Sequence, residues 1–141
     1  MIYFHSETSF QLKNKNSYKK WLKEIAKNES RRVGELNYIF CDNAYLLDIN
    51  VQYLQHDTYT DIITFDYSED NMIAGDIFIS VEMVTENAKE FAVSFEEELL
   101  RVLSHGVYHL CGYKDKTEIE AQEMRKKEEE AIRLSKEMNL L

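Results

Sequence analysis

The sequence predicts an α+β fold, with a mixed sheet of about four strands and about five flanking helices in a single layered domain over residues 1–141. Short β-prone or continuously apolar segments alternate with segments whose apolar residues recur every three or four positions. The length of 141 residues, 44% of them hydrophobic, suits one globular core. With no proline and four glycines, the chain contains no flexible linker to a second domain.

The first third of the chain predicts a strand, a helix, a second strand and a second helix. Residues 2–4 are β-prone, and residues 36–41 form the next β-prone run. Asp42 or Asn43 can cap the helix that follows, which carries Leu46, Leu47, Asn50, Val51, Tyr53 and Leu54. The helix between the strands has one apolar face, made of Tyr18, Trp21, Leu22, Ile25 and Ala26.

Two further strands and three helices are predicted for the rest. Residues 61–65 are a β-branched, nearly continuous apolar run suited to a buried strand, and residues 74–80 are its hairpin partner after a polar turn. The next helix, at about 81–91, is expected to bury Val84, Ala88 and Phe91.

Capping boxes mark the starts of the last two helices. Ser94 with Glu97, and Thr117 with Glu120, have the Ser/Thr-x-x-Glu spacing in which side chain and backbone cap each other. The final helix is heavily charged and is expected on the outside of the body, with a thin apolar seam of Ala121, Met124, Ala131 and Met138.

The charge distribution is uneven. A net charge of −9 argues against binding nucleic acid by bulk electrostatics. Residues 1–32, however, hold eight of the 17 lysines and arginines and only three of the 26 acidic residues. This asymmetry permits either a local basic contact surface or simply a solvated helix face. The candidate surface consists of Lys19, Lys20, Lys23 and Lys27.

The sequence favours a cytoplasmic protein without a membrane association. It has no run of some 18 apolar residues and no secretory signal at its start. Cys41 and Cys111 lie far apart in a chain without export features, so we expect them to be reduced.

Residues 105–115 carry the clearest chemical motif. His105 and His109 are one helical turn apart, so both imidazoles can bind the same cation. Gly112 is suited to end the helix in a left-handed conformation, which lets Asp115 return towards the pair. Two imidazoles and one carboxylate predict one Zn²⁺ per chain, with a fourth position left open as in catalytic sites. Cys111 points away along the helix, and neither His5 nor His56 has a partner at ligand spacing.

Gly106, between the two histidines, lies on the apolar face of the same helix. Glycine inside a helix costs about 1 kcal/mol relative to alanine. We therefore expect another backbone or a substrate to approach closely there, although a loosely packed position is an alternative.

The motif resembles that of the YbeY family of metal-dependent endoribonucleases. The family pattern His-Gly-x-x-His-x-x-Gly-Tyr-x-His is met except at its last position, where Asp115 stands in place of the third histidine. The matching residues are His105, Gly106, His109, Gly112 and Tyr113. Upstream, the family register is matched by Asn50, Tyr53, Asp57, Thr60, Asp61 and Phe65, and then by Gly75, Asp76 and Ile77.

This resemblance implies a hydrolase that cuts single-stranded RNA near the 3′ end of small-subunit ribosomal RNA and takes part in ribosome quality control. Its partners would be ribosomal RNA and the ribosome, and its metal ligands His105, His109 and Asp115. Asp61 is a candidate general base, although bonding a backbone group or orienting a ligand histidine is the alternative role.

Three residues depart from the family pattern. Leu54 occupies the place of an arginine thought to contact RNA, so that role does not transfer to it. Tyr59 and Asp66 replace two prolines. Lys114, Lys116 or the lysines of residues 19–27 are candidates to attract RNA instead.

Two other functions are compatible with the motif. One is a non-catalytic ribosome-assembly module in which the metal only joins helix to loop. The other is a metalloprotease, because metzincins share the ligand spacing. Gly106 argues against the protease, since those enzymes have a glutamate base at that position.

Overall fold

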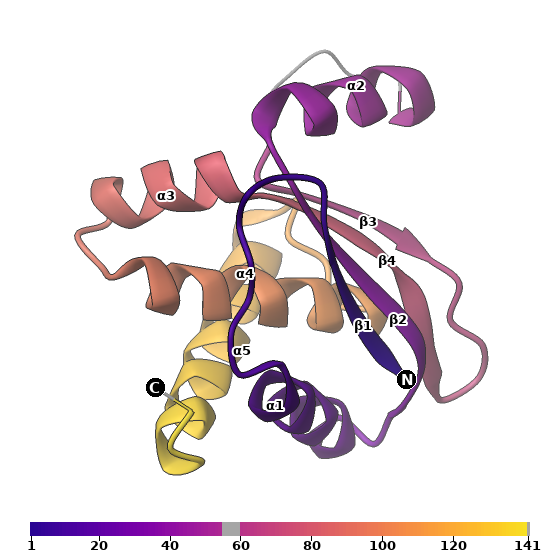
Figure 1. Ribbon diagram of the computed structural model, residues 1–141. Coiled ribbons are helices and arrows are strands. Elements are labelled where there is room, and N and C mark those ends of the chain that lie inside the picture. Colours follow the sequence, from indigo (N-terminus) through magenta and orange to yellow (C-terminus); the bar gives the residue numbers. More distant parts are fainter. Residues whose placement is uncertain (55–59, 141) are drawn as a thin grey trace.

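The computed structural model describes residues 1–54 and 60–140. It confirms an α+β architecture, with a four-stranded mixed sheet and five helices in the described part of the chain (Figure 1). The elements are β1 (Ile2–Ser6), α1 (Lys15–Asn28), β2 (Arg32–Cys41), α2 (Asn43–Leu54), β3 (Ile62–Asp66), β4 (Met72–Ser80), α3 (Val81–Glu90), α4 (Phe95–Leu110) and α5 (Glu118–Glu137).

The strands run in the order β1-β2-β4-β3. The β1–β2 and β2–β4 pairs are parallel, whereas β3 pairs antiparallel with β4, as the predicted hairpin requires. The expectation that β3 is a buried strand is wrong, because β3 forms an edge of the sheet and Ile63 is its one buried residue. An apolar run alone does not distinguish a central strand from an edge strand that is covered by other elements.

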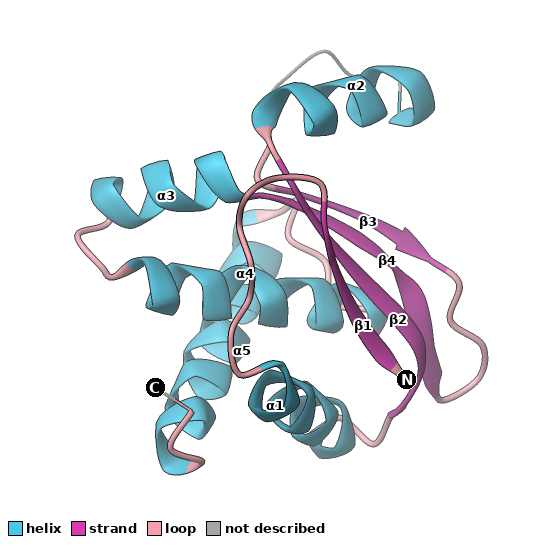
Figure 2. Ribbon diagram, in the orientation of Figure 1, coloured by secondary structure: helices cyan, strands magenta, loops and turns pink. Residues whose placement is uncertain are grey.

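Helices α1 and α4 cover one face of the sheet (Figure 2). All five apolar residues predicted for α1 are buried, and Trp21 is fully enclosed. The indole Nε1 of Trp21 donates a hydrogen bond of 2.8 Å to the carbonyl of Ala131, which ties α1 to α5. The Tyr38 hydroxyl likewise donates to the carbonyl of Leu103, joining β2 to α4 at 2.8 Å.

Helix α2 packs over one end of the opposite face, where Leu46 joins a small cluster with Cys41 and Ile63. The Asp42 side chain accepts a hydrogen bond of 2.8 Å from the backbone of Tyr45, as predicted for a cap. The predicted apolar pattern is only partly buried, because α2 overhangs the sheet. Leu46 and Asn50 are buried, whereas Val51, Tyr53 and Leu54 are exposed.

Two predictions about the later helices need correction. Phe91 lies just beyond α3 and is 53% exposed, because the chain turns away at Ala92, which has φ 55°. Of the seam predicted for the final helix, Met124 and Ala131 are buried. Ala121 is exposed, and Met138, just beyond the end of α5, is 38% exposed. The remaining buried residues of α5 are Glu128, Ile132 and Ser135. Helix α5 is thus packed against α4 and α1 along a wider and more polar strip than the predicted seam.

Both predicted helix starts are present. Thr117 with Glu120 forms the full reciprocal capping box. The box predicted at Ser94 is only half formed: Ser94 accepts a hydrogen bond from the backbone of Glu97, but the described contacts include no return bond from the Glu97 side chain. Within residues 1–54 and 60–140, no helix combines the length and apolarity needed to cross a bilayer.

Candidate metal centre

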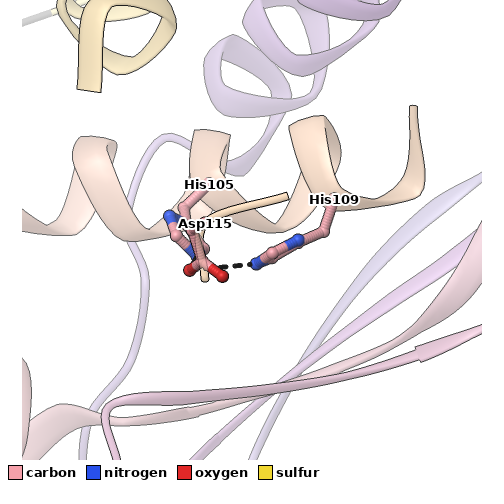
Figure 3. Close-up of side chains that lie close together, drawn as sticks. All are labelled: His105, His109 and Asp115. Carbon is pink, nitrogen blue, oxygen red and sulfur yellow. Dashed lines mark ion pairs between the residues drawn. The ribbon is translucent and has the colours of Figure 1, made fainter. Parts of the chain in front are cut away.

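Three side chains converge where α4 ends (Figure 3). His105 and His109 project from the last two turns of α4, and Asp115 returns to them from the following turn. Asp115 Oδ2 lies 3.2 Å from His105 Nε2 and 3.4 Å from His109 Nε2. One ligand atom of each residue lies within 4.8 Å of the other two, so the group could hold a metal ion.

The local sequence produces this arrangement through a turn at Gly112. Its φ of 102° is a left-handed conformation that side-chain-bearing residues adopt only with strain. Its N–H donates to the carbonyl of His109 at 3.0 Å, and the N–H of Tyr113 donates to that of Tyr108 at 3.0 Å. These bonds satisfy the last carbonyls of α4 and reverse the chain. Asp115 is therefore placed three residues after the turn and two before the cap of α5.

Close packing beneath the histidines explains Gly106. A Cβ atom at this position would lie 2.8 Å from Ile77 Cδ1 on β4, and 3.4 Å from Ile62 Cδ1 on β3. The predicted close approach is therefore present, but it is made by side chains of the sheet and not, as expected, by another backbone or a substrate. It brings α4 close to the sheet and sets both histidines at the border of the core.

Each histidine makes a second contact through the other ring nitrogen. His105 Nδ1 bonds to Glu128 Oε2 at 2.6 Å, and His109 Nδ1 bonds to the carbonyl of Tyr113 at 2.9 Å. Both acceptors require a proton on Nδ1, so in each neutral ring Nε2 carries the lone pair with which it can bind a metal. The donor set therefore fits a metal bound by two Nε2 atoms and one carboxylate oxygen, the combination that zinc accepts.

Charged groups behind His105 influence its protonation. Burial alone would lower the pKa of His105, but the hydrogen bond and charge of Glu128, together with Asp115 and Asp61, raise it above its ordinary value. Because a metal must displace this proton, metal affinity at this site falls as the pH drops through the pKa of His105.

The three residues open onto a cleft of about 780 Å³. One wall comes from α2, through Asn50 and Leu54, and another from the segment of residues 60–66, including Asp61. Lys116 also lines the cleft, beside Asp115. Such a volume is in the range of small-molecule and cofactor sites.

Asp61 lies in this cleft but does not contact a ligand histidine through a hydrogen bond. Its Oδ2 accepts a bond of 3.4 Å from the amide of Asn87, and burial raises its pKa despite the opposing charge of His105. Its roles as general base or orienting residue stay predictions. The orienting contact in the structure comes from Glu128, which sequence reasoning missed because it lies 23 residues beyond His105.

The other residues named from the sequence lie elsewhere. Asp57, Tyr59 and His56 fall outside the described residues. His5 bonds to Asn37 at 3.1 Å on the sheet, away from the cleft. Cys111 lines a separate hollow of about 440 Å³ with Arg31 and Lys114.

The candidate basic surface lies on α1, which contributes no residue to the cleft among those described. Lys20, Lys23 and Lys27 are exposed, and Lys19 is partly buried. Any contact of these lysines with RNA would therefore be remote from the metal ligands.

A buried acid on α4, Glu98, is expected to make the stability of the fold depend on pH. Glu98 is 3% exposed, and its Oε1 has no hydrogen bond, although it lies 3.6 Å from Arg101 Nε. Burial raises the pKa of Glu98 from 4.5 to about 7, against the opposing charge of Arg101. Because the folded protein holds this proton more tightly, the stabilisation is complete below pH 4.5 and is lost as the pH rises through 7.

We therefore expect Glu98→Gln, which mimics the neutral acid, to raise the free energy of unfolding at pH 8 relative to wild type. The shift in the pKa of Glu98 corresponds to a stability difference of at most about 3 kcal/mol, because one pKa unit is worth 1.36 kcal/mol. Urea unfolding of both proteins between pH 5 and 8 measures the difference. The exposed Glu96→Gln is the control, and a difference that does not change with pH would contradict the assignment.

Comparisons with known proteins identify the family of the chain. A family model described as "Endoribonuclease YbeY" matches residues 2–136. Endoribonuclease YbeY of Flavobacterium johnsoniae is 58% identical over 94% of this chain and 95% of its own length, and that of Flavobacterium psychrophilum is 53% identical over 95% and 96%.

A solved relative shares the fold. The solution structure of TM1509 from Thermotoga maritima superposes with a TM-score of 0.65 at 32% identity, covering 94% of this chain and 87% of that one. On the match over residues 2–136 and the identity of these relatives, the chain belongs to the endoribonuclease YbeY family.

Proposed function

We propose that the protein is a zinc-dependent endoribonuclease that cuts single-stranded RNA in ribosomal RNA maturation, near the 3′ end of the small-subunit RNA, and acts in ribosome quality control in the cytoplasm. The observation that carries the metal dependence is the convergence of His105, His109 and Asp115 on one point at the wall of the cleft. Family membership supports the cleavage of RNA.

The residues of the cleft have distinct parts in this proposal. His105, His109 and Asp115 would hold a divalent cation, which would supply Lewis-acid polarisation of the scissile phosphoryl group. Asp61 shares the cleft with the ligands, and burial raises its pKa above the ordinary value of an aspartate, which makes its carboxylate a stronger proton acceptor. We assign it the role of proton acceptor.

A phosphate contact must come from a residue other than Leu54, whose side chain is apolar. Lys116 lines the same cleft and is exposed, so its ammonium group can meet the RNA backbone beside the metal ligands. Leu54, 42% exposed on the opposite wall, presents an apolar surface to a base instead. We assign the missing arginine's electrostatic role to Lys116.

Gly106 argues against the metalloprotease hypothesis. That position faces Ile77 in the core, so no side chain there can reach a substrate in the cleft. Within residues 105–115 the one acidic side chain is Asp115, which is a proposed metal ligand.

The test is cleavage of a labelled single-stranded RNA carrying the small-subunit 3′ sequence, with protein purified without added metal and then given Zn²⁺ or Mn²⁺. We expect cleavage with metal and none after chelation. Double-stranded RNA of the same sequence is the matched substrate control. Metal binding without cleavage would favour the ribosome-assembly module.

The basic surface of α1 yields a separate prediction. Lys20→Glu combined with Lys27→Glu is expected to weaken RNA or ribosome association. It should also lower the slope of log affinity against log salt concentration by roughly 1.4 to 1.8, because each of the two lost phosphate contacts removes about 0.7 to 0.9. Salt titrations of binding measure this slope. Lys89→Glu with Lys136→Glu makes the same charge change on α3 and α5 as a control. Equal effects of the two pairs would refute a specific surface on α1.

A further inference from the structure

A buried carboxylate stands directly behind one metal ligand. Glu128 is 6% exposed on α5, and its Oε2 lies 2.6 Å from His105 Nδ1. The ring places this contact opposite Nε2, the atom directed at Asp115. Glu128 therefore touches the histidine without being able to occupy the coordination position on the cleft side.

The two histidines differ in the group that accepts their Nδ1 proton. His109 donates its Nδ1 proton to a neutral backbone carbonyl, whereas His105 donates to a carboxylate. A carboxylate behind a ligand imidazole fixes the tautomer and ring orientation and makes the coordinating nitrogen more basic. His105 is thus the ligand whose donor strength depends on another helix.

Glu128 is itself held in place. Arg101, one turn before His105 on α4, reaches Glu128 Oε1 through Nη1 at 3.4 Å and Glu129 Oε1 through Nη2 at 2.9 Å. The same guanidinium lies 3.6 Å from Glu98. The two carboxylate oxygens of Glu128 therefore have separate partners, one on the arginine and one on the histidine.

Stability alone does not account for an acid at this position. The α5 residues buried around it include Met124, Ala131 and Ile132. Replacing buried ionic groups by apolar residues of similar size is often neutral or stabilising. A charge on this strip, in contact with a candidate metal ligand, points to a requirement of the site.

Resting on the proposed function, we propose that Glu128 is the positioning residue of the metal centre: anchored by Arg101, it holds His105 as the Nδ1–H tautomer and strengthens Nε2 as a ligand. The described residues contain no other carboxylate hydrogen-bonded to the Nδ1 of a ligand histidine. The last helix therefore contributes to metal affinity although it supplies no ligand.

The test compares Zn²⁺ affinities by competition with a chromophoric chelator. Glu128→Gln keeps the shape and removes the charge, and Glu128→Leu also removes the acceptor. Both are expected to bind Zn²⁺ 10- to 100-fold more weakly than wild type, the range for loss of an outer carboxylate. Glu129→Gln, which alters an exposed partner of the same arginine, is expected to bind like wild type.

A second measurement uses the metal-free wild type, so its outcome does not depend on bound metal or on the folding of a variant. Long-range ¹⁵N–¹H spectra of the metal-free wild type at alkaline pH are expected to show His105 as the Nδ1–H tautomer, with His109 as an internal reference. Unchanged Zn²⁺ affinity in Glu128→Gln, or an Nε2–H tautomer of His105, overturns the proposal. If wild type binds Zn²⁺ with the predicted variant effects yet cuts no RNA, the proposed function fails while the role of Glu128 stands.

Discussion

Asp115→Ala is expected to abolish RNA cleavage and to weaken Zn²⁺ binding by more than about a hundredfold, exceeding the 10- to 100-fold loss typical of an outer partner. Asp115 supplies the single anionic ligand of the group, and two neutral imidazoles alone leave the site with half its coordination. Its side chain is 39% exposed, so the fold does not depend on it. Chelator competition and the cleavage assay measure the two losses.

Two further variants make this test specific. Asp115→His restores a donor of the type usual in the family and is expected to recover metal binding. Asp66→Ala removes another acid of the same cleft, outside the ligand group, and should leave Zn²⁺ affinity unchanged. Asp115→Ala that still cuts RNA at the wild-type rate would disprove the metal-centred assignment.

Gly75→Ala is expected to cause the largest loss of stability, about 3 kcal/mol or more. A Cβ atom on this residue of β4 would lie 2.3 Å from the backbone carbonyl oxygen of Phe65 and 3.2 Å from Leu110 Cδ2. The first clash is with the backbone of β3, so the hairpin must open to relieve it. Denaturant unfolding measures the change.

Gly34→Ala is the matched control for this substitution. Its added Cβ would approach Met72 at 2.9 Å, but every close atom belongs to a flexible side chain that can move aside. We expect it to cost less than about 1 kcal/mol. Because β3 lines the cleft, Gly75→Ala should also reduce cleavage at temperatures where the protein remains folded. Similar unfolding free energies for the two variants would contradict the packing described at Gly75.

Local patterns in the sequence were sufficient for most elements and for the convergence of the three candidate ligand side chains. The three- and four-residue spacing of α1 identified all of its buried face, and the caps at Ser94 and Thr117 located the starts of α4 and α5. The metal group was accessible for the same reason: His105, His109 and Asp115 lie within eleven residues, and a helix followed by a left-handed glycine has a known geometry.

Features that depend on long-range packing were not accessible in this way. Nothing within β3 shows that β4 lies on one side of it and no strand on the other. Phe91 was misplaced because the end of α3 is set by the turn into α4. Glu128 looks like one acid among many in a charged helix, and only the docking of α5 against α4 reveals that it faces His105.

The short connection between α4 and α5 links occupancy of the site to attachment of the last helix. Residues 112–117 are fixed at one end by the left-handed turn of Gly112 and at the other by the capping box of Thr117. A cation bound to Asp115 and the α4 histidines would hold this span in place. Glu128 on α5 would be coupled to the cation through its hydrogen bond with His105. If a bound cation stabilises the docking of α5, then by thermodynamic reciprocity a change that loosens α5 weakens cation binding by the same factor. Amide hydrogen exchange in residues 112–117 would then report the occupancy of the metal site.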